Sequence, residues 1–183
     1  RILAHHYDDD NWLRYNGSEG LYYQINRVFE SDYLESAYLY AGLGRAFHHN
    51  KYCGVLGLEK ILFNGRVNVW MEGYDRHQTN DAWRIADMHN SIWSLFFKKD
   101  YLDWYSERGF SAGLFIRLPY KISMSGSYGN EKQSSIINAF DWEDNLNYSI
   151  TDGAEQSYSV NLQFGDRLDP WSELDYLNLH LAY

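Results

Sequence analysis

The chain has 183 residues, of which 45% are hydrophobic and 18% aromatic, and its formal net charge is −9 at pH 7. This length suits one domain with a sizeable core, and the acidic charge argues against nucleic acid as a partner because phosphate binding needs clustered Lys and Arg. The sequence has no apolar run of ~18 residues that would form a transmembrane helix, and its single cysteine, Cys53, excludes an internal disulfide framework.

Alternation of apolar and polar residues is the dominant pattern, and it predicts strands with one apolar and one polar face. It is clearest near the end of the chain, where Tyr158, Val160 and Leu162 alternate with Ser and Asn. In chain order, the segments with this pattern are 21–26, 39–44, 56–59, 67–72, 110–117, 122–128, 157–164 and 177–183. We therefore expect about eight antiparallel strands.

The connections between these strands predict two unlike ends of the sheet. Residues 64–65 (Asn-Gly) have the preferred chemistry of a type I′ hairpin, and the proline of residues 118–119 (Leu-Pro) cannot continue a strand ladder. The long connections, residues 75–107 and 129–156, fall at the opposite end. Short turns at one rim and long loops at the other are typical of the periplasmic and extracellular ends of an outer-membrane barrel.

One stretch, from residue 81 to 99, breaks the strand pattern, because its apolar residues recur at spacings of three and four. These residues are Ile85, Met88, Ile92, Leu95 and Phe96. The spacing predicts an amphipathic helix, capped by Asn80 or Asp81, within a helical loop insertion at residues 78–105. We expect its apolar face to pack against the barrel's own wall; contact of Trp83 and Trp93 with lipid is the alternative.

Two-faced strands occur both in soluble sandwiches, where the apolar faces meet, and in membrane barrels, where they point outward. Polar faces rich in Ser, Asn, Gln and Tyr, strands of about ten residues, and aromatic residues at strand ends favour the membrane barrel. The fold class we predict is all-β, an antiparallel up-and-down transmembrane β-barrel. Residues 1–183 would form a single barrel domain or a fragment of a larger barrel.

Three local strings carry a resemblance to a known family. Residues 10–21 (DNWLRYNGSEGL) resemble the "RYNRVEG" string with which the barrel begins in bacterial surface-antigen proteins, the superfamily that includes barrel-assembly and two-partner-secretion translocators. Residues 78–105, with DMHNS followed by DYLDWY, are similar to a loop segment of that group, and so is Arg-Leu-Pro at residues 117–119. The resemblance implies a barrel of about sixteen strands, of which this chain supplies the first half. The family's Val-Arg-Gly-aromatic signature is absent, so no functional residue is carried over.

Three charged residues fall on the polar faces of their strands, where a barrel would direct them into the lumen: Glu59, Glu72 and Arg117. Charges buried in a lumen normally pair and support structure. A role in pore selectivity is the sharper alternative. We predict the structural role.

Other candidate sites are weaker. The Asp8–Asp10 run beside His5 and His6 could hold a divalent cation, but a solvated acidic segment is the simpler interpretation. The pair His48-His49 suggests a metal, yet adjacent residues in a turn point apart. The acidic cluster of Asp141, Glu143 and Asp144 around Trp142 could serve sugar hydrolysis, but a solvated charge cluster in a loop is the better interpretation. We predict no catalytic, cofactor or metal site.

Taken together, the sequence predicts a non-enzymatic outer-membrane barrel protein that acts as a scaffold, channel or translocator. Its expected location is the bacterial outer membrane, with the lipid bilayer as its partner and other envelope proteins as candidate further partners. The alternative is a soluble barrel or sandwich that binds a carbohydrate or small apolar ligand through aromatic surfaces.

Overall fold

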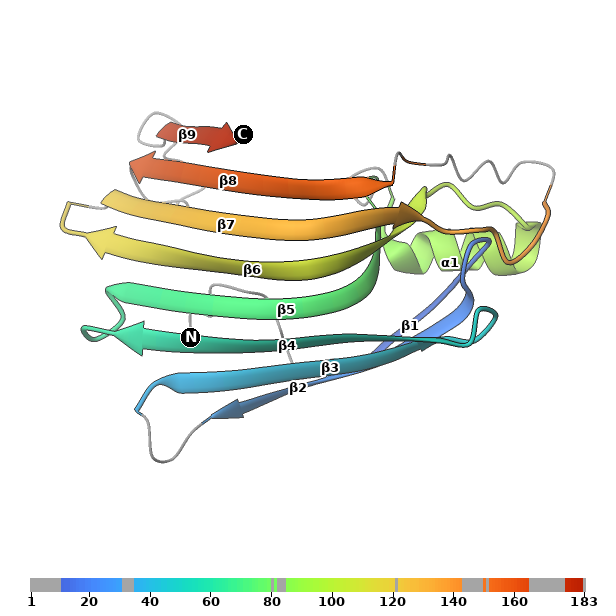
Figure 1. The fold of residues 1–183 in the computed structure, drawn as a ribbon, viewed down its shortest axis with the longest axis horizontal. Coiled ribbons are helices and arrows are strands. Elements are labelled where there is room, and N and C mark those ends of the chain that lie inside the picture. Colours follow the sequence, from blue (N-terminus) through green and yellow to red (C-terminus); the bar gives the residue numbers. More distant parts are fainter. Residues whose placement is uncertain are drawn as a thin grey trace.

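A computed structural model describes residues 11–30, 35–79, 81, 85–120, 122–142, 150, 152–164 and 177–182. These residues form one antiparallel sheet of nine strands, each paired with its neighbours in sequence, and one helix (Figure 1). The strands are β1 (Asn11–Asn16), β2 (Gly20–Glu30), β3 (Ala37–Ala46), β4 (Lys51–Leu62), β5 (Val67–Thr79), β6 (Trp104–Leu118), β7 (Ile122–Ser135), β8 (Gly153–Phe164) and β9 (Leu177–Ala182). The helix is α1 (Asp87–Phe97).

The expected all-β class and up-and-down order are confirmed, since every predicted segment lies in a strand and no connection crosses over. β1 is an additional strand that the alternation did not reveal. The sheet is open: among the described residues β1 pairs only with β2, and β9 only with β8. Closure into a transmembrane barrel therefore stays a proposal.

Several strands run further than their apolar alternation. β6 has 15 residues, β7 has 14 and β5 has 13, so the long connections shrink from the predicted 75–107 and 129–156 to residues 80–103 and 136–152. The predicted bounds were wrong because the strand ends, such as Arg76 to Gln78, are polar on both faces and give no alternation to read.

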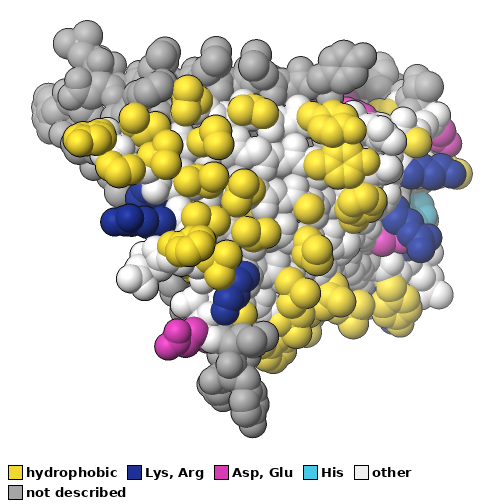
Figure 2. Space-filling view, turned by 60° about the vertical axis from the view of Figure 1, so that its left-hand side comes forward, with side chains coloured by type: hydrophobic (Ala, Val, Ile, Leu, Met, Phe, Trp, Pro, Cys, Tyr) yellow, Lys and Arg dark blue, Asp and Glu magenta, His cyan; other side chains and the backbone are white. Residues whose placement is uncertain are grey.

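The sheet has two unlike faces. We call the apolar face the side that carries these exposed hydrophobic residues: Leu21, Tyr23, Ile25, Phe29, Leu39, Leu43, Leu56, Leu58, Val69, Met71, Phe110, Leu114, Leu118, Met124, Tyr158 and Val160. Hydrophobic side chains cover much of the surface turned forward in Figure 2. The polar face is the other side, and its buried residues include Tyr22, Asn26, Tyr40, Val55, Glu59, Asn68, Glu72, Tyr74 and Glu107.

Large aromatic rings on the polar face lie over glycines of the next strand. The Tyr40 ring occupies the space beside its cross-strand partner Gly57, where an added Cβ would come within 1.8 Å of the ring. Trp70 lies in the same way over Gly113, with a Cβ approach of 2.5 Å. The absence of a side chain at these glycines is thus what lets the rings lie flat on the sheet.

The two ends of the sheet differ as predicted. At the hairpin end, turns at residues 63–66 and 119–120 lie between β4 and β5 and between β6 and β7; at the loop end lie α1 and the β7–β8 connection (Figure 1). Positive φ values at Asn64 (55°) and Gly65 (85°) confirm the type I′ requirement.

The predicted helix is confirmed over a shorter span, but its capping and its packing were wrong. It begins at Asp87 with Ala86 in the cap position; Asp81 lies in a turn before it, and Asn80 lies outside the described residues. Its buried residues are the polar Asn90 and Ser94, whereas the side chains of the apolar stripe face solvent: Met88, Ile92, Leu95 and Phe96. Hydrogen bonds to neighbouring segments, described below, explain this inverted orientation.

Candidate functional site

The turn between β1 and β2, residues 17–19, is the meeting point of the loop end. The Gly17 N–H donates to the Asp100 carboxylate (2.8 Å), which comes from the connection after α1. The Ala139 N–H of the β7–β8 connection donates to the Gly17 carbonyl (2.9 Å), and His49 Nε2 of the β3–β4 turn donates to the Ser18 carbonyl (2.7 Å). Three connections distant in sequence therefore converge on this one turn, which we call the turn hub.

Glu19 in the turn hub is fully buried and is the centre of a charged network. Arg14 of β1 donates to both carboxylate oxygens, at 2.8 and 2.9 Å. Asn16 donates from Nδ2 at 2.6 Å, and His77 of β5 donates from Nδ1 at 2.6 Å. This bidentate pairing, with two further donors, gives the buried carboxylate the partners that it needs.

Two aromatic rings hold the Arg14 guanidinium in place. Its carbon lies 4.1 Å from the centroid of the Tyr22 ring and 4.2 Å from that of the Trp104 ring. Asp87 at the start of α1 lies 3.7 Å from Arg14 Nη1. Cation–π contacts of this kind strengthen when they are desolvated, so the rings support the ion pair as well as packing against it.

Burial and charge act in opposite directions on the acids of the loop end. Burial raises the pKa of the Glu19 carboxyl, but the Arg14 guanidinium and the hydrogen bond from His77 outweigh it and lower the pKa to about 2. Burial also raises the pKa of Asp100, and the hydrogen bonds that it accepts from uncharged donors, among them Asn90 and Trp104, do not outweigh this effect. Glu19 is thus held firmly ionised, as a permanent partner of Arg14.

Polar side chains attach α1 to the same region. Asn90 donates to Asp100 Oδ1 (2.8 Å), and its own oxygen accepts from the Tyr101 N–H (2.9 Å). The Ser91 hydroxyl accepts the Tyr15 N–H of β1 (3.0 Å). These bonds explain why the polar side of the helix, rather than its apolar stripe, faces β1.

The sequence analysis missed this network, although part of its signal was in view. Arg14, Asn16 and Glu19 lie within the string that resembled the surface-antigen family, and no role was assigned to them. Asn90 and Asp100 lie in the second such string, residues 78–105, again without an assigned role, and His77 precedes it; all three meet the hub only through the fold. A charged pair five residues apart across a Gly-containing turn was the one local clue.

Glu59 and Glu72, two of the three predicted charges, are buried on the polar face. Glu59 accepts a short hydrogen bond from Asn68. Glu72 accepts from the Tyr40 hydroxyl (2.9 Å) and the Ser111 hydroxyl (3.0 Å).

Arg117, the third predicted charge, is exposed near the hairpin end. Its backbone N–H donates to the Arg66 carbonyl (2.7 Å). The structure therefore does not bring the three charges together into one cluster.

Further charges of the polar face pair across strands. Arg76 of β5 donates to Glu107 of β6 (2.9 Å), and the Tyr74 hydroxyl donates to Glu131 of β7 (2.8 Å). Gln133 donates to the other Glu131 oxygen at 2.8 Å. The polar face is thus lined by hydrogen-bonded charges, an arrangement suited to a wet or plugged interior.

Those of the weaker candidates that lie in the described part of the chain do not assemble into a reactive centre. His48 and His49 pack ring against ring at 5.1 Å, and His49 is engaged by the turn hub. Cys53 is buried against Tyr22 and Ala46. Residues 5–10, 143 and 144 lie outside the described residues, as does Trp83. Among the residues that are described, no three His, Cys, Asp or Glu side chains are grouped to hold a metal ion.

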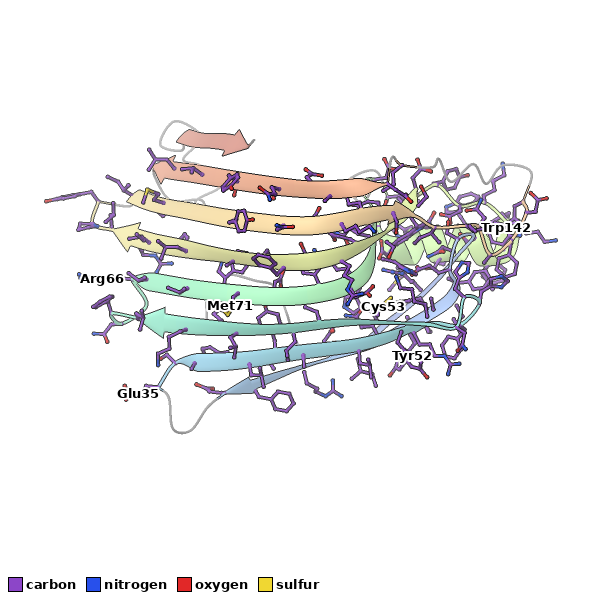
Figure 3. The ribbon with its side chains drawn as sticks, viewed as in Figure 1. Glu35, Tyr52, Cys53, Arg66, Met71 and Trp142 are labelled. Carbon is purple, nitrogen blue, oxygen red and sulfur yellow. The ribbon has the colours of Figure 1, made fainter. Side chains whose placement is uncertain are left out.

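An aromatic cluster lies on the loop end. Phe140 and Trp142 stack with centroids 5.3 Å apart and planes 4° apart, and Tyr15 lies 5.9 Å from Phe140. Figure 3 places Trp142 at this end of the sheet, opposite Arg66.

Comparisons with protein-family models, curated proteins and solved structures found no match to this chain. In the described part of the chain no helix is long and apolar enough to cross a membrane. The described residues therefore define the class of the fold as an open, antiparallel up-and-down sheet with one apolar and one hydrogen-bonded polar face.

Proposed function

We propose that the chain is a wall segment of a non-enzymatic outer-membrane β-barrel of the surface-antigen type, acting as a scaffold, channel or translocator. The apolar face carries this proposal. Its residues are exposed on long neighbouring strands, and among the described residues no second sheet covers them. Contiguous apolar surface of this extent marks contact with a partner or a membrane.

The dimensions of the apolar face fit a bilayer. On β6 every second residue from Phe110 to Leu118 is apolar. Eight residue steps cover about 27 Å along the strand, or about 20 Å along the membrane normal at a tilt of ~40°. Transmembrane barrels have an outward apolar band of about 25 Å, so the match supports lipid as the solvent of this face.

The properties of the polar face fit the inner wall of the same barrel. Its buried carboxylates, Glu59, Glu72 and Glu107, each accept a side-chain hydrogen bond on the sheet itself. We propose that Glu59 and Glu72 have structural roles in the lumen wall, with Arg117 nearer the periplasmic rim. The turn hub would then fix the extracellular loops against one another.

Solubility and gel mobility test the proposal on the full chain. The expected result is a protein that is extracted only with detergent and that migrates differently before and after boiling. Leu114→Arg places a charge on the apolar face. An arginine facing lipid at mid-bilayer destabilises a barrel by about 2–4 kcal/mol, so the variant should give less of the heat-shifted form. Tyr120→Arg, in the exposed hairpin turn, is the matched control. A chain that remains soluble without detergent would contradict the proposal.

The alternative is a soluble sheet protein that binds a carbohydrate or apolar ligand. The observation that favours it is the stacked pair Phe140 and Trp142 beside Tyr15 at the loop end. A detergent-independent protein whose tryptophan fluorescence changes with added glycans would support this alternative.

A further inference from the structure

The apolar face is not uniform, because it holds a groove of about 500 Å³ near the hairpin end. This volume lies in the range of ligand sites in proteins. The side chains of the apolar face that line the groove are Phe29, Ala37, Leu39, Leu58, Lys60, Val69 and Met71. The groove therefore crosses four neighbouring strands, β2 to β5.

The sequence explains why the sheet is hollowed here. Leu39, Leu58 and Met71 are successive cross-strand partners and form a tall apolar row, which Phe29 continues on β2. The next row toward the hairpin end has the shorter side chains of Ala37 and Val69 on either side of Lys60. The Lys60 ammonium donates to the Glu35 carbonyl, which draws its side chain toward the end of the strand. The groove is the step between the row of bulky side chains and the neighbouring row of shorter ones.

We propose that this groove binds a glycerophospholipid, with one acyl chain along the apolar row and the phosphate at the Lys60 ammonium. The proposal rests on the membrane location proposed above. In outer-membrane barrels the short turns face the periplasm, so the groove would lie in the periplasmic leaflet. An ammonium has three N–H donors, and the Glu35 carbonyl takes one of them. A lysine near the end of a membrane strand readily places its charge at the headgroup level.

Two carboxylates border the groove, and both are engaged on the polar face. Glu59 accepts from Asn68, and Glu30 accepts from the Tyr38 hydroxyl at 3.3 Å. Lys60 is therefore the charged group of the apolar face at this groove, and its sign favours an anionic headgroup.

Photolabelling in a bilayer tests the site. The full chain is reconstituted in phosphatidylcholine vesicles that contain a small fraction of phosphatidylglycerol with a diazirine in its acyl chain, and the labelled positions are mapped by mass spectrometry. We expect labelling concentrated at Leu58 and Met71. Leu114 and Val160, which are exposed on the same face outside the groove, should be labelled less. Equal labelling of all four positions would overturn the proposal.

Filling the groove gives a matched pair of variants. Ala37→Trp places a large ring in the hollow and should remove the excess labelling of Leu58 and Met71. Ala41→Trp adds the same ring to the same face of β3, four residues along the strand and outside the groove, and should leave the labelling pattern unchanged. An unchanged pattern in Ala37→Trp would contradict the site.

The headgroup contact is tested separately. Lys60→Gln should reduce the preference for the phosphatidylglycerol probe over a phosphatidylcholine probe about five-fold, which corresponds to about 1 kcal/mol. Lys132→Gln, an exposed lysine near the loop end of β7, should not change it. Equal effects of the two substitutions would overturn the role of Lys60.

The same experiments distinguish a failure of the groove proposal from a failure of the barrel proposal. A heat-shifted, membrane-inserted chain with uniform labelling would reject the groove and leave the proposed function standing. A chain that is soluble without detergent would reject both. Because the wild-type labelling pattern and Lys60→Gln do not depend on the folding of Ala37→Trp, a poorly folded tryptophan variant does not decide the question.

Discussion

The loop end and the hairpin end of this sheet are held by different kinds of interaction. At the loop end, the buried Glu19, Arg14 and Asp100 link the turn hub to β1, β5 and α1, and the Gly17 carbonyl links it to the β7–β8 connection. At the hairpin end, the turn at 63–66 depends on the positive φ of Asn64 and Gly65. One end is fixed by partners distant in sequence, the other by four consecutive residues.

This difference teaches where each end is vulnerable. A charge removed from the loop end leaves its buried partner without compensation, and several segments lose their common anchor. A residue changed in a hairpin turn costs only the local backbone energy. Substitutions at the loop end should therefore have the larger effects, and the predictions below rank the two regions on that basis.

Arg14→Met should have the largest effect, because it leaves the Glu19 carboxylate buried beside only His77 and Asn16. Breaking a buried ion pair in this way costs about 3–5 kcal/mol. Urea unfolding, monitored through the loss of the heat-shifted band, measures the change in the free energy of unfolding.

The double variant Arg14→Met with Glu19→Gln is the control. Because it removes both charges, it should be more stable than Arg14→Met alone. If the double variant is the less stable of the two, the ion pair is not what holds the loop end together.

Acid should weaken the loop end through Glu19. Its pKa is lowered from 4.5 to about 2 in the folded chain, so its stabilising contribution is complete above the unfolded pKa and is lost as the pH falls from about 5 to 2. A shift of this size corresponds to about 3 kcal/mol. The stability difference between wild type and Glu19→Gln should therefore shrink over this pH range.

Asp87 and Asp100 have raised pKa values, and they change stability with pH in the opposite sense. Both proteins keep these residues, so the contribution of Asp100 cancels in the difference between wild type and Glu19→Gln. That of Asp87 cancels only in part, because the Glu19 charge helps to raise its pKa, and the difference therefore reports Glu19 together with its effect on Asp87. A difference that stays constant from pH 7 to 2 would rule out a lowered pKa at this residue.

The fold was predictable wherever one face of a strand is apolar. Alternation in residues 157–164 and the Asn-Gly turn located β8 and the β4–β5 hairpin, because both signals depend on neighbours in sequence. The strand ends beyond the apolar face, such as Arg76 to Gln78, carried no such signal. The alternation did not predict β1 either, because its buried residues Arg14 and Asn16 are of types that normally lie on the surface.

The turn hub was not predictable, for a physical reason. Its donors include Arg14 of β1, His49 of the β3–β4 turn and His77 of β5, which meet only after the sheet has formed. The orientation of α1 failed in the same way. Helical spacing identified the apolar stripe, but the hydrogen bonds of Asn90 and Ser91 determine which side faces β1.

Gly57→Ala should have an intermediate effect within the sheet, between the two ends. The new methyl group would overlap the Tyr40 ring, which must then move from its site on the polar face. Overpacking of this kind costs about 1–3 kcal/mol. Gly73→Ala, on the neighbouring strand, is the control, because its Cβ meets no atom closer than 3.9 Å. Equal urea midpoints for the two variants would contradict the role of the Tyr40–Gly57 contact.

Gly65→Ala should have the smallest effect and should test the hairpin end alone. Gly65 has a φ of 85°, and no atom lies within 4 Å of an added Cβ. The cost is therefore backbone strain without a steric clash, about 1 kcal/mol. Gly126→Ala, at a position without positive φ, is the control for adding a methyl group, and urea unfolding compares the two. A loss as large as that of Arg14→Met would show that the hairpin end is not locally determined, and the contrast between the two ends would fail.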